Sequence, residues 1–76
     1  MERFSIYNIK KSKVGKKIVL KEIMAEPYRY RNSGHAVAYA RISYARRQKD
    51  MEDVIVKDEN GQLIFSAKEN AFFEEV

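Results

Sequence analysis

Residues 54–67, "VIVKDENGQLIFSA", contain two runs rich in β-branched and aromatic residues on either side of Asn60-Gly61. An Asn-Gly pair between two such runs is a strong short-range indication of a β-hairpin, because its type I′ turn needs positive φ at both central residues. A two-residue loop here gives the pairs Asp58–Leu63, Val56–Phe65 and Val54–Ala67. One face then carries Val54, Val56, Leu63, Phe65 and Ala67, and the other carries Ile55, Lys57, Ile64 and Ser66. We therefore predict a hairpin with one face on a core and the other partly in water.

Upstream, residues 33–49, "SGHAVAYARISYARRQK", predict a helix of about four turns, with Asn32 or Ser33 as N-cap. Basic residues in its last turn, Arg46, Arg47 and Lys49, suit the negative end of the helix dipole. At 100° per residue the apolar side chains form two stripes. The first is Val37, Ala40 and Tyr44; the second is Ala38, Ile42 and Ala45; Arg41 falls between them. Alanine permits close approach, so we expect this helix to cover the sheet.

Two further strands are predicted before the helix. The stretch "RFSIYNIKK", residues 3–11, alternates, with Phe4 and Ile6 on one face and Tyr7 and Ile9 on the other. Residues 17–25 fit a short helix nearly as well as a strand, and we favour a strand that pairs with the first one across a lysine-rich loop. Pro27 is expected to end this element. The result is an α+β fold of order β-β-α-β-β, an antiparallel sheet with one helix packed on one face. Phe72-Phe73, near the C-terminus, is expected to complete the core.

Size and composition narrow the class of protein. The 76 residues suffice for one domain, 1–76, with a small core. The absence of cysteine excludes disulfides and thiolate metal sites. No apolar run approaches the ~20 residues that span a bilayer, and the N-terminus lacks the apolar segment of a signal peptide. We therefore expect a cytoplasmic protein that does not associate with membranes.

Charge is distributed unevenly along the chain. Residues 1–50 hold 13 Lys/Arg and 4 Asp/Glu, whereas residues 51–76 hold 2 and 7, which gives a net charge of +4. Such a chain either presents one basic face to an anionic partner or neutralises its basic part with the acidic third. Both interpretations remain open at this point.

Few residues suit catalysis or metal binding. His35 is the only histidine, and its place beside the helix N-cap is typical of an exposed first-turn residue. The stretch "VGKK", residues 14–17, lacks the first glycine and the hydroxyl residue of a phosphate-binding loop. Asp58, Glu59 and Asn60 offer oxygen ligands, but the turn itself explains Asn60. We expect a protein that is not an enzyme and holds no metal or cofactor.

The candidate partner-binding residues are basic and aromatic. Lysines crowd the tip of the first hairpin, two arginines alternate with tyrosines in "YRYR", and further arginines lie on the helix. They are Lys10, Lys11, Lys13, Lys16, Lys17, Tyr28, Arg29, Tyr30, Arg31, Arg41, Arg46 and Arg47. Cationic side chains neutralise phosphates and tyrosines stack on bases. The alternative is a plain solvated surface, with Tyr28 and Tyr30 as the inward face of an edge strand.

The size, the lack of cysteine and the order of elements resemble small bacteriophage proteins that interfere with host machinery, such as anti-CRISPR proteins and inhibitors of host transcription. The resemblance implies a stoichiometric binder that occupies a site on a larger host protein or nucleoprotein. We expect a monomer or homodimer. Many such proteins are acidic and mimic DNA, whereas this chain is basic over most of its length. We predict a non-enzymatic module with a basic face that binds nucleic acid or a nucleic-acid-bound complex. The alternative is a phage-type inhibitor that binds a host protein directly, through an acidic surface of that protein.

Overall fold

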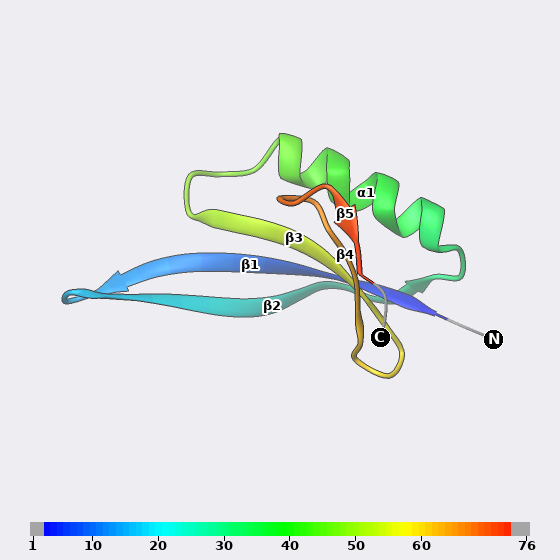
Figure 1. The fold of residues 1–76 in the computed structure, drawn as a ribbon, viewed down its shortest axis with the longest axis horizontal. Helices are drawn as coiled ribbons and strands as arrows, with labels where there is room; N and C mark the ends of the chain where they lie inside the picture. Colours follow the sequence, from blue (N-terminus) through cyan, green and yellow to red (C-terminus); the bar gives the residue numbers. More distant parts are fainter. Residues whose placement is uncertain (1–2, 74–76) are drawn as a thin grey trace.

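The structure is a computed structural model that describes residues 3–73. Its elements are β1 (Phe4–Val14), β2 (Lys17–Tyr30), α1 (Ser33–Ala45), β3 (Met51–Asp58), β4 (Leu63–Ser66) and β5 (Ala71–Phe72). The strands form one antiparallel sheet in the order β2-β1-β3-β4-β5, with α1 beside it (Figure 1). The predicted order β-β-α-β-β is confirmed, and the short strand β5 follows it. Residues 74–76, which include part of the predicted acidic third, lie outside the described residues.

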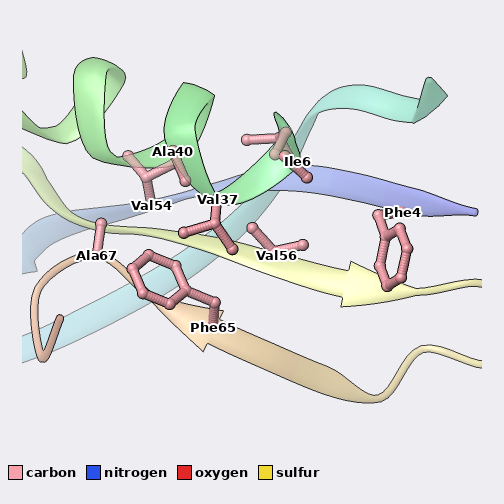
Figure 2. Packing of buried hydrophobic residues seen from close by; sticks show 9 residues of the cluster. Phe4, Ile6, Val37, Ala40, Val54, Val56, Phe65 and Ala67 are labelled. Atoms are coloured by element: carbon pink, nitrogen blue, oxygen red, sulfur yellow. The ribbon is translucent and has the colours of Figure 1, made fainter. Parts of the chain in front are cut away.

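The core lies between α1 and one face of the sheet (Figure 2). Strand alternation supplies its sheet side, as predicted, and α1 supplies Ala36, Val37 and Ala40. The buried sheet residues are Phe4, Ile6, Val54, Val56, Phe65 and Ala67. Of the first predicted helix stripe, Val37 and Ala40 are buried and Tyr44 is half-buried. The residues of the second stripe, Ala38, Ile42 and Ala45, are exposed, because the sheet offers the helix a single face.

The helix begins as predicted and ends earlier. The side chain of Asn32 is the N-cap and accepts hydrogen bonds from the amides of Gly34 at 2.7 Å and His35 at 3.3 Å. Arg46 is the C-cap, so Arg46, Arg47 and Lys49 follow the helix and do not form its last turn. The chain reverses here toward β3, and the amide of Lys11 donates to the carbonyl of Asp50 at 2.7 Å.

The β3–β4 hairpin is confirmed, but not its two-residue loop. Gly61 has the expected positive φ, 80°, whereas Asn60 does not share it. The Gly61 amide donates to the Asp58 carbonyl, and the Asp58 amide donates to the Gln62 carbonyl, both at 3.0 Å. This is a three-residue loop with glycine in the left-handed position. The Asp58 carboxylate favours it, because that carboxylate accepts from the amides of Asn60 and Gln62 at 2.9 Å.

The longer loop shifts the register beside it. Val56 pairs with Phe65, and the Ala67 amide donates to the Val54 carbonyl, as predicted. Leu63 instead pairs with Lys57, and Ile64, not Leu63, packs against the core. The predicted core role of Phe72 and Phe73 is also wrong. Their side chains are 59% and 42% exposed, and Phe72 contacts the outer side of Phe65 with ring centroids 5.0 Å apart.

Strand β2 settles the ambiguous segment 17–25 as a strand, and it continues through Pro27 to Tyr30. The expectation that Pro27 ends the element is therefore wrong. As the edge strand of the sheet, β2 tolerates a residue that lacks an amide hydrogen. Two register shifts of β2 against β1 and a φ of 43° at Tyr28 accommodate Pro27 within the strand.

Candidate functional site

The tip half of the β1–β2 hairpin, residues 10–21, projects beyond the rest of the molecule (Figure 1). We call this segment the arm. The expected lysine-rich loop is in fact mostly strand: only residues 15–16 form the turn, where Gly15 has a φ of 62°. The residues from 11 to 21 are all exposed, and Lys10 is half-buried. The arm therefore presents its side chains to solvent on both faces.

The arm carries six lysines and no acidic residue. Five were predicted site residues, Lys10, Lys11, Lys13, Lys16 and Lys17, and the sixth is Lys21. Sequence reasoning missed Lys21 because residues 17–25 were ambiguous. A prediction of a tight turn at Gly15 would have placed Lys21 in the arm, because the strand register set by such a turn pairs Lys21 with Lys10. Among residues 3–73, the one ion pair that involves an arm lysine joins Lys11 Nζ to Glu52 Oε2 at 3.6 Å.

The lysines are distributed over both faces of the arm. The register shifts along β1 place the extra residues in β2 and β3, so β1 itself keeps its alternation. Lys10 therefore shares the helix-side face with the buried Ile6, and its partner Lys21 does too. Lys17 pairs with Val14 on that same face. Lys11 and Lys13 point to the opposite face, and Lys16 lies in the turn. Like charges directly opposite each other, as in Lys10 and Lys21, destabilise a strand pair.

The base of the arm lies next to the segment that follows the helix. Arg46, Lys49 and Asp50 are exposed there, and Asp50 is tied to the Lys11 backbone. The Arg47 guanidinium lies 3.9 Å from the centroid of the Tyr44 ring and donates to the Tyr44 carbonyl at 3.0 Å. Arg47 is therefore held against the end of the helix.

Glu52, one of the acids at the base of the arm together with Glu22 and Asp50, is already paired. Glu52 contacts Lys11 and also forms an ion pair with Lys68. The hydrogen bond and the charge of Lys68 lower the pKa of Glu52, and the same contacts raise the pKa of Lys68. Glu52 therefore does little to neutralise the remaining lysines of the arm.

The "YRYR" segment lies at the other end of β2. Arg29 lies twelve positions after Lys17, at most about 40 Å at ~3.3 Å per residue. Arg29 Nη1 pairs with Glu26 Oε2 at 3.3 Å, and Arg31 is exposed. The structure does not bring these arginines to the lysines of the arm.

The two tyrosines of this segment differ. Tyr30 packs against the core and lies 5.9 Å from the Tyr39 ring, and its burial raises its pKa. Tyr28 is 40% exposed. Arg41, from the helix, lies 5.1 Å from the centroid of the Phe65 ring, and its Nε donates to Asn70 Oδ1 at 3.2 Å. Among these aromatic residues, Tyr28 and Tyr39 are the most exposed, at 40% and 39%.

Features of an enzyme site are scarce in the part of the chain that the structure describes. His35 is exposed in the first helical turn. Residues 3–73 form no pocket and contain no group of three or more side chains that could hold a metal ion. None of their helices combines the length and hydrophobicity needed to cross a bilayer. No family model, curated protein or solved structure matches the chain.

Proposed function

We propose that this protein binds nucleic acid without catalysing a reaction, and that the arm is its contact surface. The observation on which this proposal rests is the location of the positive charge in the chain. The chain has a net charge of +4, and residues 10–21 supply six lysines without an acid, so all other residues together sum to −2. The whole positive excess therefore lies on one projecting ribbon. Lysines gathered in this way neutralise phosphates and release their counterions.

The exposure of the arm lysines and their scarcity of ion pairs support the proposal. They are exposed or half-buried, and the ion pair at Lys11 is the one such contact in the arm among residues 3–73. Lys10 and Lys21 repel each other across the ribbon. Bound phosphates would relieve that repulsion, so binding should stabilise the arm.

A charge-matched pair of variants tests this assignment. Lys16→Glu with Lys17→Glu, and Arg29→Glu with Arg31→Glu, change the net charge by the same amount at opposite ends of β2. Fluorescence anisotropy with a labelled oligonucleotide should show a loss of about 10-fold or more for the arm variant. The second variant should stay close to wild type. Loss confined to the second variant would place the site at "YRYR", and equal losses would mean that only net charge matters.

A second candidate function, direct binding of a host protein, is favoured by the apolar edge of the sheet. The exposed side chains on β2 include Val19 at 44%, Leu20 at 57%, Ile23 at 37% and Met24 at 43%. An edge strand of this kind can accept a strand from a partner. Affinity capture with and without nuclease separates the two candidates. A partner that is retained after nuclease treatment supports protein binding, and a partner lost with it supports the arm.

A further inference from the structure

The geometry of the arm points to a specific ligand, double-stranded DNA with the arm seated in its major groove. This inference rests on the proposed function and adds to it the class of nucleic acid and the mode of contact.

The arm lacks the side chains that hold single strands. Proteins that bind unpaired nucleic acid place successive bases on aromatic rings. Residues 8–27, which contain the whole arm, include no Phe, Tyr or Trp. The nearest ring in β1, Tyr7, is half-buried, and Lys57 Nζ lies 4.9 Å from its centroid. The arm is therefore suited to a phosphate surface of fixed shape and not to splayed bases.

Positive charge on both faces of the ribbon favours insertion between two phosphate walls. A ribbon that lay flat on a backbone would use the lysines of one face only. Here Lys10, Lys17 and Lys21 leave one face, and Lys11 and Lys13 leave the other. Inside a groove, each set would reach a different strand of the duplex.

Dimensions select the groove. A ribbon with side chains on both faces is about 10 Å thick. It exceeds the minor groove of B-DNA, which is about 6 Å wide, and fits the major groove, which is about 12 Å wide. The major groove of A-form RNA is deep and narrow and does not admit such a ribbon. The paired segments 10–14 and 17–21 extend about 16 Å, the rise of about five base pairs.

The tip would enter the groove with an apolar end. Val14 and Ile18, at 65% and 64% exposed, are the most exposed large hydrophobic side chains of residues 3–73. They flank the turn on opposite faces of the ribbon. The floor of the major groove carries thymine methyl groups, which accept apolar contact. Ser12 is the only uncharged hydrogen-bonding side chain in the arm, so we expect little base preference.

Three probes of one sequence test the ligand class: a DNA duplex of about 20 base pairs, the matching RNA duplex and one DNA strand. At equal salt, wild-type protein should bind the DNA duplex at least about 10-fold more tightly than either alternative. Equal or tighter binding of the RNA duplex or the single strand would overturn the inference and leave the proposed function standing. Absence of binding to all three would overturn the proposed function itself.

Groove occupancy and the apolar tip are tested with the DNA duplex. Methyl green, which occupies the major groove, should displace the protein, and netropsin, which occupies the minor groove, should not. Displacement by netropsin alone would overturn the inference. Val14→Ser with Ile18→Thr keeps every charge and should weaken binding about 5- to 10-fold without changing the salt dependence. Ile42→Thr, an exposed helix residue away from the arm, is the matched control. Equal affinity of the tip variant and the control would overturn the seating of the tip.

Discussion

Gly61 has a φ of 80° in the β3–β4 loop, and no atom lies within 4 Å of the position that a Cβ would take. Only the backbone conformation therefore opposes a side chain here. Gly61→Val should lower the free energy of unfolding by about 1 kcal/mol or more, because β-branched residues are strained at positive φ. Urea denaturation measures the change. Asn60→Ala, at a neighbouring position without positive φ, should cost less. Equal stability of Gly61→Val and wild type would contradict the loop geometry.

The ion pair between Glu52 and Lys68 makes the stability of the fold depend slightly on pH. The Lys68 hydrogen bond and charge hold the pKa of Glu52 below its ordinary 4.5, so the stability that this carboxylate contributes is present above that pH and is lost as pH falls. The pKa of Lys68 is raised above 10.5, so its contribution is lost only when pH rises beyond that value. Thermal denaturation from neutral pH into the acid range should show a smaller loss of stability for Glu52→Gln than for wild type. A Glu52 pKa of 4.5 or above, measured by NMR titration, would contradict the ion pair.

At the scale of the element, alternation of apolar residues was enough to predict which residues of β1 and β3 enter the core under the helix, but not that Ser5 and Ile55 on the opposite face are buried as well. Phe4 and Ile6 lie in the core and Tyr7 and Ile9 do not, because only one face of β1 meets the helix. Helical periodicity likewise predicted the buried Val37 and Ala40, although the alanines of the helix spread apolar surface over several sides. The end of the helix, by contrast, depends on the reversal toward β3, which is a tertiary effect.

The candidate site was predictable in composition and not in arrangement. The lysines were visible as a cluster, but their distribution over two faces depends on how tightly Gly15 closes the ribbon. Arg29 also looked available in the sequence, although Glu26, three residues away, pairs with it. Which charges remain unpaired depends on local contacts such as that of Arg29 with Glu26 and on contacts between strands such as that of Lys11 with Glu52.

The arm as an element should be separable from the fold. None of its residues belongs to the buried core cluster. Replacing residues 12–19 with Asn-Gly joins Lys11 to Leu20, which already face each other, through a loop suited to a two-residue hairpin. The shortened protein should unfold cooperatively, with a melting temperature near that of wild type, and should lose nucleic-acid binding. Cooperative unfolding with unchanged affinity would show that the arm is dispensable for binding.

At the scale of the whole molecule, the +6 arm projects from a remainder that sums to −2. Binding to duplex DNA should therefore depend steeply on salt, and the arm should account for that dependence. The logarithm of the binding constant falls by about 0.9 per contacted phosphate for each unit in the logarithm of salt concentration, so six lysines set a slope of at most about −5. Lys16→Glu with Lys17→Glu should flatten the slope by about 2, whereas Arg29→Glu with Arg31→Glu should leave it unchanged. Titrations at several salt concentrations measure both slopes. If the "YRYR" variant flattened the slope as much as the arm variant, the charge at the far end of β2 would also contact DNA, and a ribbon acting alone would be ruled out.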